Sequence, residues 1–507
     1  MLNQGVGSWI SRRARRTPDR VAIMHEGRAS TYLGLHERVS RLAGALRGLG
    51  VGRGDRIAYL GPNHQAYLET LFAAGTLGAV FVPLNMRLAG PELAHHLTDS
   101  GSSVLVYAPA QAAVLASIRT DLVLRHVVAL AEPGEGEHDY EELLASAAPD
   151  PADEPVSLGD PCLIMYTSGT TGRAKGATLT HGNITWNAIN VLVDADFGQD
   201  EMALVVAPLF HTAALNMLCL PAILKGGTVL IESAFDPARA LDLIARHRVT
   251  SMFGVPAIYD AMAGAAGWAD ADISSLRTLL CGGAPVPEAT IRAYLARGVT
   301  FIQGYGMTET SPGALLLDAA HVESKAGSAG IPHFFTDVRV VGPDLADTVP
   351  GERGEIVVAG PNVMQGYWGL PEATAAALAD GVWLRSGDVA TTDEDGYVFV
   401  VDRIKDVIIS GGENIYPAEV ENAIRDHPAV VECGVIGVPD DKWGEVGRAI
   451  VVLRPGTEVA EEEILGFLDG RLARYKIPKS VRFTGSLPRT ATGKILKKSL
   501  RETHGAG

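Results

Sequence analysis

The stretch Tyr-Thr-Ser-Gly-Thr-Thr-Gly-Arg-Ala-Lys-Gly at residues 166–176 is the most informative part of this chain. It places three glycines, four serine or threonine residues and a lysine directly after the apolar run Cys-Leu-Ile-Met at residues 162–165. Glycines let backbone N–H groups approach a polyphosphate closely, while hydroxyls and a lysine add donors and positive charge. The spacing differs from that of the Walker loop. Taken alone, the stretch also fits a flexible surface turn.

Length and composition limit the possible functions. A chain of 507 residues is too long for one ordinary core, so we expect at least two domains. Its 47% hydrophobic and 20% charged residues are typical of a soluble globular protein. The 43 Lys and Arg against 59 Asp and Glu give a net charge of −16, which disfavours nucleic acid as a partner. An acidic protein that binds a polyphosphate must gather its cations locally.

Cysteine usage and apolar segments predict a cytoplasmic protein without an integral membrane segment. The four cysteines show no metal-ligand spacing, and three lie in apolar runs, as buried free thiols do in a reducing compartment. Residues 1–20 are rich in arginine, but no apolar segment follows them, so they are not a secretory signal. The longest apolar stretch, residues 203–224, contains prolines, a histidine and an asparagine. We interpret it as core and pocket wall rather than as a membrane span.

Hydrophobic periodicity predicts alternating helices and strands. A helix begins at residues 30–31, ends at the glycines of 50–52 and precedes a strand at 56–60. The same alternation recurs at 237–253 and at 287–303. Such alternation indicates parallel sheets flanked by helices. The acidic, Ala- and Pro-rich residues 133–155 are predicted to be a solvated connection.

The pattern changes near residue 325. Short alternating runs at 338–341 and 355–358 predict antiparallel strands in a small lobe. A compact unit follows residue 403, and its predicted elements are a helix at 417–426, strands at 430–436 and 448–453, and a helix at 461–472. We therefore place a domain boundary near Lys405.

A second motif, Gln-Gly-Tyr-Gly-Met-Thr-Glu at residues 303–309, follows a predicted strand. Glycines around Tyr305 leave one face of the ring open, which suits stacking on a purine. Beside a triphosphate, the Glu309 carboxylate needs an intervening cation, so we predict that it binds Mg²⁺. Without the stretch at 166–176, an ordinary turn with an exposed glutamate would be the simpler interpretation. The small residues of Cys-Gly-Gly-Ala-Pro at 281–285 suit either a tight turn or a close approach of ligand to backbone.

These motifs, with Ser-Gly-Asp at 386–388, Asp-Arg at 402–403 and Thr-Gly-Lys at 492–494, resemble signatures of the adenylate-forming superfamily. That superfamily comprises acyl-CoA synthetases, peptide-synthetase adenylation domains and luciferases, and the chain is most similar to actinobacterial feruloyl-CoA and fatty-acyl-CoA synthetases. The resemblance implies an α/β fold, with a large N-terminal domain of flanked sheets plus a small β-barrel-like lobe at 1–403. It also implies a small mobile α+β C-terminal domain at 406–507, which carries Lys494 and turns about a hinge near Lys405.

The resemblance also assigns roles to individual residues. Catalytic roles fall on Lys494, Thr308, Glu309 and His211. Cofactor-binding roles fall on Thr167, Ser168, Gly169, Thr170, Thr171, Lys175, Gly283, Ala284, Gln303, Gly304, Tyr305, Asp388, Arg403, Lys405, Gly411 and Gly412. Asp388 and Arg403 would contact the ribose, and Lys494 would neutralise charge between the substrate carboxylate and the α-phosphate. Taken alone, the first two would be a surface pair and Lys494 part of a solvated basic tail.

The predicted acyl pocket is apolar. Its candidate residues are Phe210, Thr212, Phe253, Val255, Tyr259, Gly306, Met307 and Pro312. None is basic, which argues against a dicarboxylate such as malonate, because the second charge would lack a partner. Tyr259 would limit the pocket or hydrogen-bond a ring hydroxyl, and His211 would be either a lid beside the substrate carboxylate or a bystander. The resemblance favours a hydroxycinnamate such as ferulate, with medium- or long-chain fatty acids as the alternative.

The sequence thus predicts an AMP-forming acid–CoA ligase that uses ATP, Mg²⁺ and coenzyme A through an acyl-adenylate. It would act in phenylpropanoid degradation or in fatty acid metabolism, as a monomer or homodimer whose partners are a small carboxylic acid, ATP and CoA. One alternative is an adenylating enzyme that delivers acyl groups to a separate carrier protein. Others are a luciferase-like oxygenase, which would reuse the same site, and a non-catalytic binding protein with the same fold.

Overall fold

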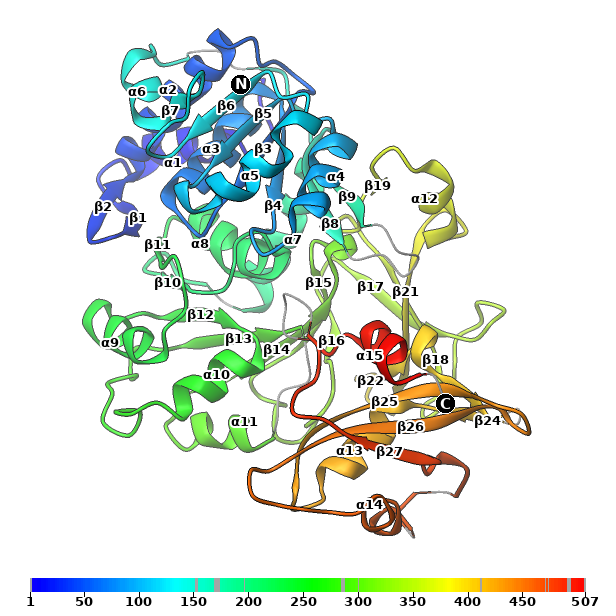
Figure 1. The fold of residues 1–507 in the computed structure, drawn as a ribbon. Helices are drawn as coiled ribbons and strands as arrows, with labels where there is room; N and C mark the ends of the chain where they lie inside the picture. Colours follow the sequence, from blue (N-terminus) through cyan, green and yellow to red (C-terminus); the bar gives the residue numbers. More distant parts are fainter. Residues whose placement is uncertain are drawn as a thin grey trace. The chain divides into compact units, whose positions relative to one another are not determined.

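The computed structural model describes most of the chain, and its elements are labelled in Figure 1. The described residues are 2–150, 154–167, 174–195, 197–283, 288–299, 301–410, 413–469, 471–472, 474–489 and 494–505. The chain divides into two compact units. The first comprises Met1–Val338 and Val358–Leu384, and the second comprises Arg339–Val357 and Arg385–Gly507. The hinge expected near Lys405 falls inside the second unit and stays a prediction.

One sheet of the first unit carries the strand that precedes the stretch at 166–176. Among the described residues it has eight strands, in the order β19 (Gly366–Tyr367), β9 (Lys175–Thr180), β8 (Pro161–Thr167), β4 (Val80–Leu84), β3 (Arg56–Leu60), β5 (Val104–Tyr107), β6 (His126–Ala129) and β7 (His138–Asp139). Pairs from β8 to β7 are parallel, whereas β9 is antiparallel to both β8 and β19.

The other sheet of this unit carries the second motif. In the part of the chain that the structure describes it has nine strands, in the order β16 (Ile331–Pro332), β15 (Gly313–Leu317), β14 (Phe301–Gly306), β13 (Thr278–Gly282), β12 (Ser251–Gly254), β10 (Met202–Val205), β11 (Thr228–Ile231), β1 (Val21–His25) and β2 (Arg28–Thr31). Neighbours from β14 to β1 are parallel. The predicted parallel sheets flanked by helices are confirmed.

The helices of the first unit begin and end near the predicted residues. Helix α2 (Tyr32–Gly48) starts where the Thr31 side chain accepts a hydrogen bond from the Gly34 N–H, a typical helix cap. The two later helix–strand alternations also form, with helices α9 (Pro237–His247) and α11 (Glu288–Leu295) preceding strands β12 and β14.

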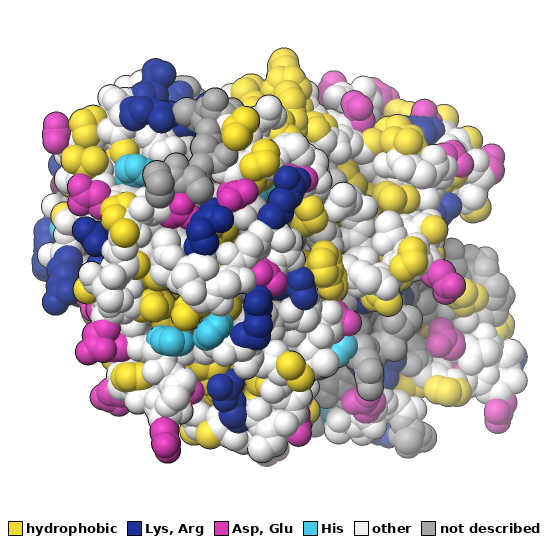
Figure 2. Space-filling model, turned by 90° about the horizontal axis from the view of Figure 1, so that it is seen from above, with side chains coloured by type: hydrophobic (Ala, Val, Ile, Leu, Met, Phe, Trp, Pro, Cys, Tyr) yellow, Lys and Arg dark blue, Asp and Glu magenta, His cyan; other side chains and the backbone are white. Residues whose placement is uncertain are grey.

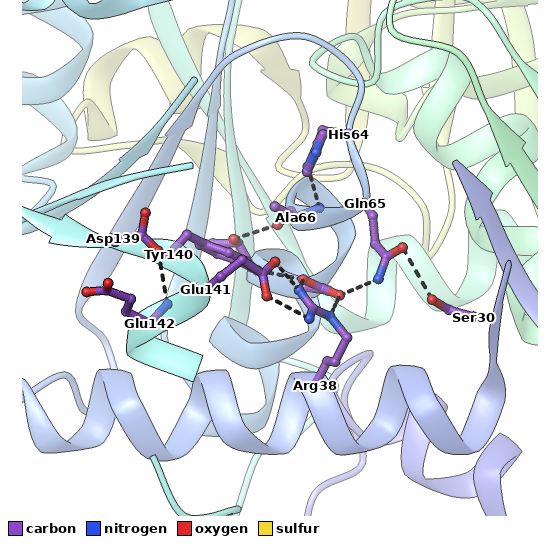
Figure 3. A network of polar contacts seen from close by, with 11 residues as sticks. Ser30, Arg38, His64, Gln65, Ala66, Asp139, Tyr140, Glu141 and Glu142 are labelled. Atoms are coloured by element: carbon purple, nitrogen blue, oxygen red, sulfur yellow. Dashed lines mark hydrogen bonds and ion pairs between the residues drawn. The ribbon is translucent and has the colours of Figure 1, made fainter. Parts of the chain in front are cut away.

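The buried carboxylate of Glu69 holds helices α2 and α3 (Gln65–Leu77) together with helix α6 (Tyr140–Ser146), and Figure 3 labels its partners Arg38, Gln65 and Tyr140. Glu69 has no exposed surface, and its oxygens accept hydrogen bonds from Arg38 Nε at 2.5 Å and Nη2 at 3.1 Å. Two further donors reach the Glu69 carboxylate: Gln65 Nε2 at 2.7 Å and the Tyr140 hydroxyl at 2.8 Å. Buried charge is tolerable only when it is paired and hydrogen-bonded in this way.

Helix α6 corrects the prediction that residues 133–155 are a solvated connection. Tyr140 and Leu144 are 1% and 3% exposed and pack into the core, because they lie four residues apart on one helical face. The acidic Glu141 and Glu142 in the first turn dominate the local composition and conceal these two apolar residues.

The long apolar stretch at 203–224 is core, as predicted. It supplies strand β10, the π-helical segment η3 (Ala214–Cys219) and helix α8 (Leu220–Lys225), whose side chains are almost all buried. No helix among the described residues is long and apolar enough to cross a membrane. The cysteines at 162, 219, 281 and 433 are buried free thiols. Charged side chains of both signs are interspersed on the face drawn in Figure 2.

The strands predicted for a small lobe also form a sheet. Of the residues that are described, five strands build it: β17 (Asp337–Val341), β18 (Gly354–Ala359), β21 (Trp383–Thr392) and β20 (Leu378–Ala379) in this order, with β22 (Val398–Arg403) paired to β21. The chain passes from one unit to the other within strands of this sheet.

The remainder of the second unit is an α+β fold with its own core, as expected. Its sheet has five described strands: β24 (Glu413–Ile415), β23 (Ile408–Ser410), β26 (Gly444–Leu453) and β25 (Val430–Asp440) in this order, with β27 (Ser480–Phe483) paired to β26. The helices are α13 (Pro417–Arg425), α14 (Glu461–Phe467) and α15 (Lys497–His504). Helix α14 ends earlier than predicted. Val420, Val435 and Ile464 have no exposed surface and lie at the centre of this core.

Candidate functional site

Strands β8 and β9 form a hairpin that brings together the two ends of the predicted phosphate-binding stretch. Thr167, the last residue of β8, pairs with Lys175, the first residue of β9. Four of the expected phosphate-binding residues lie outside the described residues: Ser168, Gly169, Thr170 and Thr171. The hairpin fixes where the stretch enters and leaves the sheet.

Glu309 lies beside this hairpin. It belongs to the short helix η4 (Thr308–Thr310) that follows β14, and its Oε1 accepts hydrogen bonds from the Tyr367 hydroxyl at 2.9 Å and Thr167 Oγ1 at 3.4 Å. Lys175 Nζ lies 5.0 Å from the centre of the Tyr367 ring, in a cation–π contact. Four elements thus bring a carboxylate, two hydroxyls and an ammonium group together.

The sequence analysis missed Tyr367. It lies on β19, and its hydrogen bond to Glu309 joins residues 58 positions apart. Burial and the nearby Glu309 carboxylate raise the pKa of Tyr367, so the hydroxyl stays protonated and donates. A Gly-Tyr-Trp sequence gives no local signal of such a role.

The oxygen groups around Glu309 fit a magnesium ion. Mg²⁺ is usually held by one or two carboxylates together with water and substrate phosphates rather than by a cage of protein ligands. Across the described part of the chain there is no cluster of three or more His, Cys, Asp and Glu side chains that would hold a metal by itself. A single carboxylate beside the hairpin that carries the predicted phosphate-binding stretch therefore suits Mg²⁺ bound with a polyphosphate.

Residues of the predicted nucleotide motif lie along the end of β14. Gln303 is buried, whereas Gly304, Tyr305 and Thr308 are partly exposed. Glycine is needed here for close packing: a Cβ added at Gly306 would lie 1.6 Å from the Pro312 carbonyl oxygen. On the neighbouring strand β13, a Cβ at Gly282 would lie 2.9 Å from the Gly304 carbonyl oxygen. Gly283 beyond it has φ +86°, and Ala284 lies outside the described residues.

The predicted acyl-pocket residues follow the ends of adjacent parallel strands. Strands β10, β12, β13 and β14 are neighbours, and ligands of open α/β sheets bind beyond the carboxyl ends of such strands. Phe253 at the end of β12 is 6% exposed, and Val255 follows it as a partly exposed residue. A Cβ at Gly283 would lie 3.7 Å from Val255 Cγ1, so these two strand ends meet. Met307 is partly exposed and Pro312 is buried.

Phe210, His211 and Thr212 follow β10. The rings of the first two lie 4.6 Å apart, and Thr212 Oγ1 accepts a hydrogen bond from Asn216 Nδ2 at 2.9 Å. Burial, with a smaller contribution from positive Arg87, lowers the pKa of His211 to about 4. The imidazole is therefore neutral at physiological pH, and its buried Nε2 has no hydrogen-bond partner among the described residues. A neutral ring with an unused nitrogen suits a wall that meets a substrate carboxylate.

Tyr259 does not lie where we predicted. The side chain has no exposed surface and belongs to the core on helix α10 (Pro256–Ala263), with its ring 4.8 Å from that of Phe301. Its hydroxyl donates to the backbone carbonyls of Met252 at 3.1 Å and Leu280 at 2.8 Å. A buried hydroxyl with such partners does not line a pocket, so we remove Tyr259 from the candidate pocket residues.

Helix α7 (His181–Asp194) supports the pocket with a buried row of asparagines that the sequence analysis also missed. Asn187 has no exposed surface, and its Oδ1 accepts the Gly313 N–H at 3.0 Å while its Nδ2 donates to the Asn216 carbonyl at 2.8 Å. The residue thus ties the segment after Pro312 to the segment after Thr212. The spacing of asparagines at 183, 187 and 190 was the available signal, because it places polar groups on one helical face.

The second unit gathers the other predicted residues. Asp388 on β21 pairs with Arg403 on β22, and Arg403 Nε lies 3.0 Å from Asp388 Oδ1. Asp388 is 4% exposed, whereas Arg403 and Lys405 are exposed. Lys494 is exposed as a residue, and the charges of Arg403, Asp388 and Lys405 act on its ammonium group.

Charge is concentrated in this cluster. Burial and the positive charges of Arg403 and Lys405 lower the pKa of Lys494, against the opposing effect of Asp388. Burial followed by Arg403 likewise lowers the pKa of Lys405. Arg403, Lys405, Lys494 and Arg501 outnumber the carboxylates of Asp388 and Asp406, so the cluster has a local excess of positive charge in a chain whose net charge is −16. Such a cluster suits an anionic ligand. Gly411 and Gly412 lie outside the described residues.

Comparison with known proteins shows to which family the chain belongs. The family profile described as AMP-binding enzyme matches residues 10–368. The chain belongs to the AMP-binding enzyme family. The profile described as AMP-binding enzyme C-terminal domain matches residues 419–494 and ends at Lys494. Residues 369–418, which include the expected hinge, lie between the two matches.

Relatives of this AMP-binding enzyme cover its full length. A feruloyl-CoA synthase of Amycolatopsis sp is 59% identical over 505 residues, which cover 100% of each chain. An indoleacetate–CoA ligase of Aromatoleum aromaticum is 44% identical over 98% of each chain. Among solved structures, o-succinylbenzoate coenzyme A synthetase from Bacillus subtilis with ATP and magnesium ion has a TM-score of 0.88 and 33% identity, over 97% of this chain and 99% of that chain.

These matches confirm the predicted family, fold class and type of enzyme. The AMP-binding enzyme is an acid–CoA ligase of the AMP-forming kind, which makes an acyl-CoA through an acyl-adenylate. ATP and CoA are its expected co-substrates. Delivery to a carrier protein and a non-catalytic role are not favoured.

Proposed function

We propose that this AMP-binding enzyme activates a hydroxycinnamate, with ferulate as the favoured acid. The observation that carries the proposal is the 59% identity to a feruloyl-CoA synthase over the whole of both chains. The composition of the candidate pocket supports it, because none of its candidate residues is basic and could pair with a second carboxylate, although positive Arg87 lies near His211. Ferulate has a single carboxylate and a planar aromatic tail, so its charged group is also the group that reacts.

In the first half-reaction, a carboxylate oxygen of the acid attacks the α-phosphorus of ATP. The bond from that phosphorus to the bridging oxygen breaks, and pyrophosphate leaves with the electron pair. Thr167 and Lys175 hold the phosphates, Tyr305 stacks on adenine and Thr308 contacts the α-phosphate. Lys494 neutralises the charge that develops between the carboxylate and the α-phosphate. Positioning and electrostatic stabilisation are most of what such a reaction requires of a protein.

Glu309 is the proposed ligand of Mg²⁺. The hydrogen bond from the Tyr367 hydroxyl keeps the carboxylate oriented before metal and nucleotide arrive. Bound Mg²⁺ would supply positive charge to the phosphates of ATP. In the second unit, Asp388 accepts from the ribose hydroxyls and Arg403 makes the second ribose contact.

In the second half-reaction, the CoA thiolate attacks the carbonyl carbon of the acyl-adenylate, and AMP leaves. The unit at 406–507 turns about Lys405 between the two half-reactions, because the space that Lys494 occupies during adenylation must be cleared for the thiol. His211 closes the pocket beside the carbonyl. The mixed anhydride reacts readily with water, so closure protects it.

The proposal includes a cytoplasmic location and a monomeric or homodimeric state. The location rests on the four free cysteines, which are buried and do not form disulfides. Size-exclusion chromatography with light scattering would measure the oligomeric state.

The test is AMP formation by the purified enzyme with ATP, Mg²⁺, CoA and a panel of acids. The panel comprises ferulate, p-coumarate, benzoate, octanoate, palmitate and malonate. We expect the highest kcat/KM for ferulate or p-coumarate and no turnover of malonate. A preference for octanoate or palmitate would refute the hydroxycinnamate proposal in favour of a fatty acid. Lys494→Ala should slow adenylation by about 10²–10³-fold, and unchanged adenylation would refute its role.

A further inference from the structure

Helix α4 (Gly90–Ser100) contacts the hairpin of β8 and β9 at the end where the stretch at 166–176 leaves and re-enters the sheet. The Tyr166 hydroxyl donates to Asp99 Oδ2 at 2.7 Å, and the Tyr166 ring is stacked on His96, with ring centres 4.0 Å apart and an interplanar angle of 8°. Just before the other strand, β9, His95 Nε2 lies 3.3 Å from the Ala174 carbonyl oxygen. One helix therefore holds the chain where it leaves β8 and where it enters β9.

These contacts adjoin the residues that face Glu309. Tyr166 directly precedes Thr167, and Ala174 directly precedes Lys175. Thr167 and Lys175 pair across the hairpin, and Thr167 Oγ1 is hydrogen-bonded to Glu309. A shift of either strand end would therefore move a hydroxyl or an ammonium group that we place on the phosphates of ATP.

Gly176 provides a second, independent observation. It is the cross-strand partner of Tyr166, and a Cβ added there would lie 3.4 Å from Tyr166 Cζ and 2.6 Å from Ile164 Cγ2. The final glycine of the stretch at 166–176 thus leaves room for the Ile164 side chain, and the Tyr166 ring lies beside the same glycine at an ordinary contact distance. His96 is 5% exposed, and its burial keeps the ring neutral while it stacks.

We propose that Tyr166, His95, His96 and Asp99 form a positioning set that holds Thr167 and Lys175 in place for ATP. The inference rests on the proposed function of the hairpin but assigns to α4 a role in nucleotide affinity. Neither the acyl pocket nor the CoA thiol takes part in the contacts of α4 with the hairpin. Removing these contacts should therefore weaken ATP binding and leave binding of the acid and of CoA unchanged. A purely structural role would instead lower stability without favouring one substrate.

Tyr166→Phe tests the proposal, because it removes the hydroxyl and keeps the stacked ring. Asp99→Ala removes the acceptor of the same hydrogen bond. Because Asp99 is exposed, this variant is a second test if Tyr166→Phe folds poorly. Tyr107→Phe is the matched control: the Tyr107 hydroxyl donates to Glu137 Oε2 at the same 2.7 Å, on strand β5 of the same sheet. Tyr166→Phe and Tyr107→Phe each remove one hydrogen bond from a tyrosine hydroxyl to a carboxylate. Tyr166 lies in the hairpin itself, whereas Tyr107 lies on a strand further along the same sheet.

We would measure ATP–pyrophosphate exchange with ferulate and the full-length enzyme, varying ATP and then ferulate. Loss of one hydrogen bond to a carboxylate should raise the KM for ATP by roughly five- to tenfold in Tyr166→Phe and Asp99→Ala. The KM for ferulate should change by less than about twofold, and Tyr107→Phe should resemble the parent enzyme in both.

An unchanged KM for ATP in both variants, or an equal rise in both KM values, would overturn the proposal. Calorimetric titration with ATP and Mg²⁺ in the absence of acid separates this failure from that of the proposed function. If ferulate is not the substrate, exchange fails in the parent enzyme too, yet weaker ATP binding in Tyr166→Phe than in Tyr107→Phe still supports the role of α4. Equal ATP affinity of those two variants overturns it.

Discussion

Replacement of Arg38 by methionine tests whether the buried Glu69 carboxylate holds the helices of the first unit together. Glu69 has no exposed side-chain surface, and the Arg38 side chain is 31% exposed. Methionine retains much of the apolar stem but removes both guanidinium hydrogen bonds to Glu69. The carboxylate then keeps Tyr140 and Gln65 as donors and loses its only cation among the described contacts in Figure 3.

The expected cost follows from these contacts. Removing one partner of a buried ion pair typically costs about 3–5 kcal/mol, because the remaining charge is left uncompensated. Two hydrogen bonds remain and Arg38 is partly accessible to water, so we expect about 2–3 kcal/mol for Arg38→Met. Arg246→Met is the control, because Arg246 pairs with Asp242 at the surface with 62% and 49% exposed side chains. An exposed pair contributes about 0–1 kcal/mol.

Urea unfolding followed by tryptophan fluorescence measures the difference. Of the six tryptophans, all but Trp443 lie in the first unit, so fluorescence reports mainly on the unit that contains Glu69. Adding Glu69→Gln to Arg38→Met removes the uncompensated charge and should recover about half of the lost stability. The reasoning is refuted if Arg38→Met costs no more than Arg246→Met, or if the added Glu69→Gln lowers stability further.

Three further predictions concern pH and the support of the pocket. Lys405→Met removes a positive neighbour of Lys494 and should raise its pKa, so the alkaline limb of pyrophosphate exchange should move to higher pH; an unmoved limb would contradict the charge cluster. Burial lowers the pKa of His181 to about 4, below the unfolded value of about 6.5. The unfolded chain therefore binds the extra proton as the pH falls. The free energy of unfolding should drop between pH 6.5 and 4 by up to about 1.4 kcal/mol per pH unit. Urea titrations at several pH values would measure this slope, which should be smaller in His181→Gln. Asn187→Asp keeps the acceptor but loses the donor to the Asn216 carbonyl, so the KM for the acid should rise about tenfold while that for ATP changes little; equal changes would argue against its role at the pocket.

Local patterns were sufficient to predict the elements that carry a clear period or a cap. Helix α2 has apolar residues at helical spacing and a threonine cap, and both act within a few residues of the chain. The loop after β8 was also accessible, because glycines and hydroxyls after an apolar run indicate that a strand ends there, but the antiparallel partner β9 was not predicted. Thr167 and Glu309, predicted from separate motifs, lie within hydrogen-bond distance in the structure.

Contacts between distant segments could not be predicted in this way. Tyr367 contributes a hydroxyl to Glu309, and Tyr140 contributes one to Glu69, but the pairs are 58 and 71 residues apart. Only the sheet order and the packing of α6 bring them together. A tyrosine in an irregular or acidic segment looks the same whether its hydroxyl meets solvent or a buried carboxylate.

Tyr259 follows the end of a strand and was predicted to line the pocket, but it lies in the core. Phe253 and Val255 lie at or just after the end of β12, and the neighbouring ends of β10, β13 and β14 supply the other pocket residues. Helix α10 begins at Pro256, and one turn of helix is enough to carry Tyr259 from the sheet edge into the core, where its hydroxyl returns to the carbonyls of Met252 and Leu280. The proposed pocket is thus confined to residues at the strand ends and in the short segments that follow them. Substitutions that alter acid preference should therefore cluster in these short segments, and changes within α10 should act on stability instead.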